Sequence, residues 1–278
     1  VKIDKILYDK GRRYIRNIDD YTCYVSTNED GQLFLTELSE QLRAYDLALN
    51  HKKTSIDELP TASVEQWVRK INTFTAFDTK EKMNFKEVRA YLDMAIELMQ
   101  ENHDNAAILN YAMKVLAKKQ LTENAKSYYV KTIFHLTVIY PYLVSLLEEY
   151  VFMPFGVETT MISKISALLY EEGVKLKNYE AVCYALYYAN KYEFEIRELD
   201  FDVAKSSNNC LFLLFSYLYY EKKKDKAAVK MCKDYARSLL ATEMDNFWLF
   251  IYEALPQSDL RDYWKAMKKS KVSFLVEI

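Results

Sequence analysis

Apolar residues along most of the chain recur at intervals of three and four positions, which is the period of an amphipathic α-helix. From residue 61 onward this pattern is interrupted only by short polar breaks, at 102–104, 118–122, 153–156, Gly173 and Pro256. The predicted helices cover Val64 to Phe74, Phe85 to Met99, Ala106 to Leu116, Ala125 to Leu147, Ile162 to Leu169, Tyr179 to Tyr188, Cys210 to Tyr220, Ala227 to Leu240 and Phe247 to Leu255. Helices joined in this way predict stacked helix pairs, an irregular α-helical repeat over residues 61–278.

Residues 1–60 have a different pattern, with short runs of β-branched and aromatic residues. Tyr14 to Ile18 and Tyr21 to Val25 are predicted strands, and Asp19-Asp20 is predicted to form the tip of the hairpin between them. Downstream of the hairpin we expect a turn at 28–31, an amphipathic helix from Phe34 to Tyr45 and a further strand from Leu47 to Asn50. The chain is therefore predicted to be mainly α, with one small α+β region at its start.

The scarcity of glycine and proline supports this assignment. The chain contains 4 glycines and 4 prolines in 278 residues, whereas average glycine usage is roughly 7%. Sandwiches, barrels and propellers need tight turns at regular spacing, so they are excluded. The sequence also lacks the glycine-rich motifs of Rossmann and P-loop phosphate sites.

Charge and cysteine usage bear on the partners of the protein and on its cellular compartment. With 38 Lys and Arg against 40 Asp and Glu, no global basic field indicates a nucleic-acid partner, and such contacts would need local patches. Four widely spaced cysteines, without a C-x-x-C motif, predict reduced thiols and a cytoplasmic protein: Cys23, Cys183, Cys210 and Cys232. No apolar run is long enough to predict a membrane span.

The Asp19-Asp20 pair is the strongest chemical feature. Adjacent carboxylates are costly inside a core, because each must be desolvated and the two repel each other. A tight hairpin would instead direct one or both at a hard divalent cation such as Mg²⁺. The alternative is an ordinary solvated turn.

The surrounding order of elements resembles the C-terminal part of a reverse-transcriptase palm over about residues 12–60. In that family motif C is an x-x-D-D hairpin, and motif D ends in L-x-L-N-x-x-K-T. This chain has Asn17-Ile18-Asp19-Asp20, with Asn17 in place of the common tyrosine, and then LALNHKKT over residues 47–54. The resemblance implies that residues 1–60 are a partial palm.

The helical region is similar to that of the abortive-infection, defence-associated reverse transcriptases of the AbiK type, in which a HEAT-like helical repeat domain follows the palm. The segments 105–112 and 245–253 add to this similarity. The family implies antiphage DNA synthesis from dNTPs, untemplated or protein-primed, by an enzyme that forms homo-oligomers. None of the 24 tyrosines is distinguished as a priming residue, and most are expected to pack in the core.

The resemblance also implies roles for three residues. Asp19 and Asp20 match the motif C carboxylates and would be Mg²⁺ ligands in two-metal nucleotidyl transfer. Lys53 matches the motif D lysine and would neutralise or protonate the leaving pyrophosphate; a solvated lysine is the alternative.

A polymerase of this family needs a further aspartate from motif A and a nucleotide-binding motif B, both upstream of motif C. The residues before Asp19 are too few to supply them. The chain begins at Val1 within a charged segment, so we expect it to be the C-terminal portion of a longer polymerase and expect the isolated chain not to polymerise.

Two basic clusters are candidate nucleic-acid contacts. Lys10, Arg12, Arg13 and Arg16 precede the hairpin, where a primer or template phosphate would approach. The second cluster is Lys222, Lys223, Lys224 and Lys226, followed at helical spacing by Lys230 and Lys233. The alternatives are a solvated strand edge for the first cluster and complementation of a helix dipole for the second.

The sequence thus supports two hypotheses of different class. One is a portion of an antiphage reverse transcriptase with DNA or RNA as partner. The other is a non-catalytic α-helical repeat scaffold that binds protein or nucleic acid, in which Asp19-Asp20 is only a turn. An upstream segment in the same reading frame, with a strand bearing an aspartate, would favour the first hypothesis.

Overall fold

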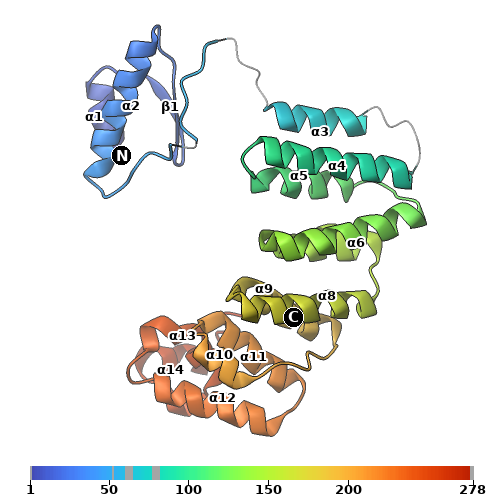
Figure 1. The fold of residues 1–278 in the computed structure, drawn as a ribbon. Coiled ribbons are helices and arrows are strands. Elements are labelled where there is room, and N and C mark those ends of the chain that lie inside the picture. The colour runs from blue at the N-terminus through green and yellow to red at the C-terminus, as the bar shows by residue number, and fades with distance from the viewer. Residues whose placement is uncertain (1, 52, 60–64, 77–81, 276–278) are drawn as a thin grey trace. The chain divides into compact units, whose positions relative to one another are not determined.

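The computed structural model describes residues 2–51, 53–59, 65–76 and 82–275. The chain divides into two compact units, residues 1–65 and residues 66–278 (Figure 1). Helices dominate the described residues, and their only sheet is a two-stranded hairpin, so the prediction of a mainly α fold is confirmed. No helix formed by these residues has the length and apolar character needed to span a bilayer.

The first unit packs a hairpin against two helices. Its elements are α1 (Lys2–Asp9), β1 (Tyr14–Asn17), β2 (Asp20–Cys23) and α2 (Asn28–Arg43). The strands pair antiparallel from Tyr14↔Cys23 to Asn17↔Asp20, so the predicted hairpin is present with strands shorter than expected. Three side chains are buried at the centre, Leu7 of α1 with Phe34 and Leu38 of α2.

Two predictions for the first unit are wrong. Residues 28–31 are the first turn of α2, because the Thr27 hydroxyl accepts a hydrogen bond from the Asp30 amide at 3.1 Å and caps the helix. Residues 47–50 form no strand, because they pair with neither strand of the hairpin, which is the only described sheet. Helix α1 was not predicted.

The second unit is a succession of packed helices. Their bounds are α3 (Gln66–Ala76), α4 (Phe85–Glu101), α5 (Ala106–Leu116), α6 (Glu123–Ile139), α7 (Met153–Phe155), α8 (Thr159–Lys175), α9 (Tyr179–Tyr192), α10 (Phe201–Ser206), α11 (Cys210–Lys222), α12 (Lys226–Leu239), α13 (Met244–Ala254) and α14 (Asp262–Lys269). Within this unit α4 packs on α5 and α6, α8 on α9, and α11 on both α9 and α13. One continuous apolar core runs from Trp67 to Leu260.

The predicted helix from Ala125 to Leu147 is shorter than expected. It ends at Ile139, since Pro141 has no amide hydrogen for the helical ladder. The chain continues as a 3₁₀ turn (Pro141–Leu146), a π turn (Glu148–Phe152) and the short α7, which ends at Gly156 with φ +53°. Neither α10 nor α14 was predicted.

The π turn places Glu148 in a network with α9. Its carboxylate accepts hydrogen bonds from the hydroxyls of Tyr187 (2.8 Å) and Tyr192 (3.0 Å) and pairs with Lys191 at 2.8 Å. Burial alone would raise the pKa of Glu148, but the bonds from Lys191 and the two tyrosines outweigh it, and the pKa is lowered. The network therefore stabilises the fold above the ordinary glutamate pKa and is lost as the pH falls through the depressed value.

Gly173 does not end a helix, contrary to the sequence-based expectation. It lies inside α8, where a Cβ atom would come within 2.8 Å of Val182 Cγ2 and 3.0 Å of the Asn178 carbonyl oxygen. Glycine is needed there because α8 and α9 approach closely, not because the chain turns.

Several helices are followed within a few residues by a left-handed residue that is not glycine. The structure contains ten non-glycine residues with positive φ among those it describes and only two such glycines. After α8, for example, Lys177 has φ +56°, and the Asn178 amide donates to the Gly173 carbonyl at 2.8 Å. The same six-residue closure follows α11, where Lys224 has φ +58° and the Asp225 amide donates to Tyr220 at 3.0 Å.

The residue after each of these turns then begins the next helix. Asn178 caps α9, Asp225 caps α12, and Asn105 and Asn209 cap α5 and α11, each accepting a backbone amide with its side chain. The α8–α9 and α11–α12 hairpins are thus closed by very short loops of the same design.

Because Lys177 has a left-handed backbone, we expect Lys177→Gly to stabilise the protein. A non-glycine residue in this region costs roughly 1–2 kcal/mol, and the extra chain entropy of glycine offsets about half, so the free energy of unfolding should rise by about 0.5–1 kcal/mol. Urea denaturation of both proteins measures this difference.

The matched control is Lys164→Gly, at an exposed lysine in the interior of α8. It should lower stability by about 0.5–1 kcal/mol because glycine is a poor helix former. A Lys177→Gly protein no more stable than the parent would contradict the strain at this turn.

Candidate functional site

The connection between β1 and β2 is a two-residue turn formed by Ile18 and Asp19. Ile18 has φ +57°, while Asp19 is not among the left-handed residues. A positive φ at the first central residue alone matches a type II′ turn, in which glycine is usual at that position. The sequence predicted both aspartates at the tip; the structure places only Asp19 there, because Asp20 pairs with Asn17 as the first residue of β2.

Both carboxylates of the candidate site are exposed to solvent. Because side chains alternate along a strand, Asp20 lies on the face opposite Tyr21, which points toward the helices. Carboxylate oxygens are the donors that Mg²⁺ prefers. Among the described ranges, however, no group of three or more His, Cys, Asp or Glu side chains is placed to hold a metal ion, so these two residues alone do not complete a metal site.

Lys53 lies in an exposed turn, not in a strand. Its amide donates to the Asn50 carbonyl at 2.9 Å, and its side chain is exposed. No hydrogen bond or ion pair described for this part of the chain joins Lys53 to Asp19 or Asp20. The structure therefore does not bring the three predicted catalytic residues into contact.

The basic residues before the hairpin are largely engaged within the first unit. Arg12 Nε donates to Glu37 Oε2 at 2.7 Å, and Lys10 lies 3.9 Å from the other oxygen of this carboxylate. The hydrogen bond from Arg12 lowers the pKa of Glu37. The Arg13 guanidinium lies over the ring of Tyr8, 4.3 Å from its centroid. These contacts tie the hairpin to α1 and α2.

Arg16 contacts three elements. Its Nη1 atom lies 2.7 Å from Asp4 Oδ2, its Nε donates to the Ile18 carbonyl at 2.8 Å, and its guanidinium lies 5.0 Å from the Tyr21 ring centroid. The importance of Asp4 was missed in the sequence, since a single acidic residue in an unpredicted helix gives no signal.

The hairpin also exposes large apolar side chains. Ile15 is 63% exposed, Ile18 84% and Tyr24 66%. Ile15 pairs with Thr22 on the face away from the helices. One face of this two-stranded sheet is thus packed against α1 and α2, and the other is open.

The second predicted basic cluster is only partly free. Lys222 donates to the Asn190 carbonyl and lies 3.8 Å from Glu193, so it ties α11 to the end of α9. Lys223 lies 5.8 Å from the Tyr219 ring centroid. Lys224 and Lys226 are exposed on the turn and at the start of α12, and Lys230 follows on the same helix.

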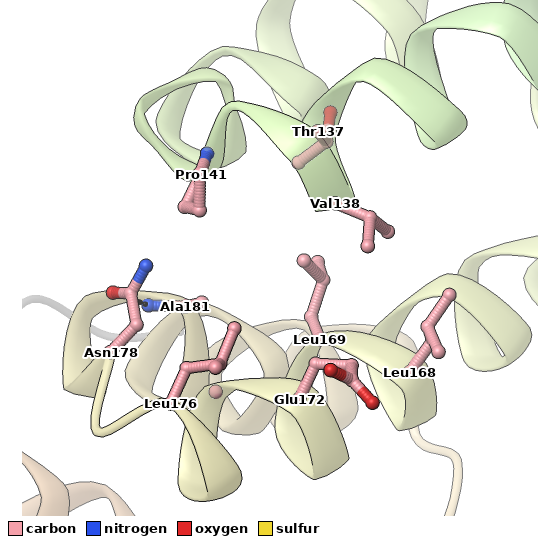
Figure 2. A pocket seen from close by; sticks show the side chains of 10 residues that line it. Thr137, Val138, Pro141, Leu168, Leu169, Glu172, Leu176, Asn178 and Ala181 are labelled. Carbon is pink, nitrogen blue, oxygen red and sulfur yellow. Dashed lines mark hydrogen bonds between the residues drawn. The ribbon is translucent and has the colours of Figure 1, made fainter.

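A small cavity lies between the α6 end and the α8–α9 hairpin. Figure 2 shows Leu169 of α8 pointing toward Val138, with Pro141 above Asn178. Its volume of about 20 Å³ has room for roughly one water molecule. Apart from Glu172 its lining lacks ionisable side chains, so we assign it no chemistry.

Because Lys222 is engaged in helix packing, the nucleic-acid hypothesis is best tested on its neighbours. Exchanging Lys223, Lys224 and Lys226 for glutamate should weaken binding of a single-stranded oligonucleotide about tenfold or more at low salt, through lost phosphate contacts. Fluorescence anisotropy over a salt series measures this loss.

A matched control has the same change of net charge elsewhere on the helical unit: Lys131, Lys164 and Lys175, all exposed, exchanged for glutamate. Binding should fall much less in this variant. Equal losses in the two triple variants, or no loss in the first, would contradict a nucleic-acid contact at the α11–α12 turn.

Comparisons of the chain with known proteins identify no family. No protein-family model, curated protein or solved structure matches the chain.

Proposed function

We propose that this chain is the motif C and D portion of a reverse-transcriptase palm joined to a HEAT-like α-helical repeat domain. In this proposal the complete enzyme synthesises DNA from dNTPs in antiphage (abortive infection) defence. Its partners are DNA or RNA and further copies of itself, and it works in the cytoplasm, where its four free cysteines stay reduced.

The observation that most supports the proposal is the hairpin turn. Two adjacent exposed carboxylates lie at the connection between paired strands, Asp19 in the two-residue turn and Asp20 as the first residue of β2, and the hairpin packs on the amphipathic helix α2 that follows it in sequence. This is the order and placement expected of motif C. An ordinary solvated turn has no need of a left-handed isoleucine beside its aspartates.

A second support is the small size of the unit's own core. Only Leu7, Phe34 and Leu38 are buried together among its described residues, while Ile15 and Tyr24 stand exposed on or beside the hairpin. A two-stranded hairpin is marginal alone and gains stability from further strands. Further strands of a palm would pair with the outer edges of the hairpin, which no described strand occupies.

The roles of the residues follow from their chemistry. Two Mg²⁺ ions, when bound, would supply charge stabilisation at the α-phosphate of a dNTP and activate the attacking hydroxyl. Asp19, at the tip, and Asp20, at the start of β2, would provide oxygen ligands. The motif A aspartate would come from a part of the polymerase other than residues 1–278. Lys53, on its exposed turn, would approach the leaving pyrophosphate.

In this proposal the helical unit binds nucleic acid or further copies of the chain. Its short, repeated hairpin closures and continuous core are typical of repeat scaffolds. The same features favour the second candidate function, a scaffold without catalysis, which needs only the helical unit and its free lysines.

Nucleotide incorporation distinguishes the two functions. We expect the chain alone to incorporate no labelled dNTP with Mg²⁺, and the same chain joined to its upstream reading frame to incorporate it. In the longer protein Asp19→Asn should slow incorporation by about a hundredfold or more, since a lost metal ligand forfeits several kcal/mol of transition-state stabilisation.

Asp9→Asn is the matched control, because Asp9 is an exposed aspartate at the end of α1 and should leave the rate unchanged. Activity of the isolated chain that disappears in Asp19→Asn would contradict the need for a motif A aspartate from elsewhere. An inactive longer protein that still binds oligonucleotides would favour the scaffold.

A further inference from the structure

We propose that Arg16 and Asp4 are positioning residues that hold the Ile18–Asp19 turn, and with it the adjacent Asp20, in its strained geometry. The sequence assigned Arg16 to a nucleic-acid phosphate, and no role was assigned to Asp4. That the restrained turn serves to position metal ligands rests on the proposed function. The contacts that restrain the turn do not depend on it.

The turn needs an external restraint. Ile18 is β-branched, and its backbone is left-handed with φ +57°, a conformation that such residues rarely adopt. Its side chain is 84% exposed, so packing of the side chain does not hold the backbone there. Residues in such conformations persist when the surrounding structure determines them.

Arg16 supplies that restraint. Its Nε donates to the Ile18 carbonyl at 2.8 Å, which fixes the peptide that links Ile18 to Asp19. Its guanidinium lies over the Tyr21 ring of the opposite strand, which limits how the side chain swings. One side chain of β1 thus contacts both the turn and β2.

Asp4 holds Arg16 in place. Its Oδ2 atom pairs with Arg16 Nη1 at 2.7 Å, and its Oδ1 atom accepts a hydrogen bond from the Tyr14 hydroxyl at 2.9 Å. Asp4 lies on α1, whose Leu7 is buried in the unit's core. The chain of contacts from α1 through Asp4 and Arg16 therefore anchors the turn to the packed part of the unit.

These contacts also argue against Arg16 as a phosphate ligand. Two of its donor atoms are occupied, by Asp4 and by the Ile18 carbonyl. A phosphate would have to compete with a carboxylate already paired in a charge-assisted geometry.

Amide exchange and Mn²⁺ broadening on the ¹⁵N-labelled 278-residue chain test the proposal. In Arg16→Gln and in Asp4→Asn, exchange of the Asp20 amide should speed up roughly fivefold or more relative to the Leu38 amide, since a charge-assisted hydrogen bond is lost. Leu38, buried on α2, reports loss of the whole unit, so a variant that merely unfolds is recognised.

Mn²⁺ used as a probe separates positioning from simple electrostatics. Removing the Arg16 charge would by Coulomb attraction alone strengthen cation binding beside the aspartates. Positioning predicts the opposite: in Arg16→Gln the Mn²⁺ concentration that half-broadens the Asp19 and Asp20 amides should rise about threefold or more, because the ligands lose their fixed geometry.

Arg12→Gln is the matched control. The substitution removes the same charge as Arg16→Gln, but the Arg12 side chain bonds Glu37 and not the turn. It should leave the Asp20-to-Leu38 exchange ratio within about twofold of the parent. Equal exchange ratios in Arg12→Gln and Arg16→Gln would overturn the positioning role. So would a gain in oligonucleotide affinity on Asp4→Asn that exceeds the gain on Asp9→Asn, because it would show Arg16 released to bind phosphate.

The proposed function and the positioning role are contradicted by different results. If Mn²⁺ does not broaden Asp19 and Asp20 selectively in the parent chain, the metal site is contradicted, while the exchange ratios still decide whether Arg16 and Asp4 hold the turn.

Discussion

The structure depends on reversing the chain abruptly with side chains other than glycine. Lysine, histidine, aspartate and asparagine occupy left-handed positions at the helix ends, as at Lys177 and Lys224. Each position stores some strain, and the six-residue closure with an asparagine or aspartate cap on the next helix offsets it. Short closures bring consecutive helices side by side, and the continuous core of residues 66–278 follows from that proximity.

The hairpin of the first unit also reverses the chain through a left-handed residue that is not glycine, but a different contact stabilises it. There the left-handed residue is Ile18, which is less suited to the position than lysine or asparagine because it is β-branched. No helix closure offsets its strain; instead Arg16, held by Asp4, bonds the Ile18 carbonyl. A strained backbone residue that is held by bonded side chains and lies directly beside two exposed carboxylates is typical of a functional site.

Sequence patterns predicted the parts of the fold that depend on local periodicity. The hairpin follows from its runs of β-branched and aromatic residues, and helices such as 106–116 follow from apolar spacing. What failed depends on distant partners. Gly173 was mistaken for a helix end because the approach of Val182 is a tertiary contact. Residues 47–50 have the composition of a strand, but strand formation also needs pairing with another strand, and these residues do not pair with the hairpin. The pairing of Arg16 with Asp4 was likewise not predicted, since the two residues lie twelve positions apart in the sequence.

The central claim is that the Ile18–Asp19 turn presents a metal ligand in a fixed geometry. Anomalous diffraction at the manganese absorption edge, on crystals of the chain soaked in Mn²⁺, tests it most directly. The account predicts a peak roughly 2.0–2.3 Å from an Asp19 carboxylate oxygen, with Ile18 left-handed and Arg16 on its carbonyl. A peak only at other surface carboxylates, or an Ile18 that relaxes to negative φ while Arg16 turns to solvent, would contradict it.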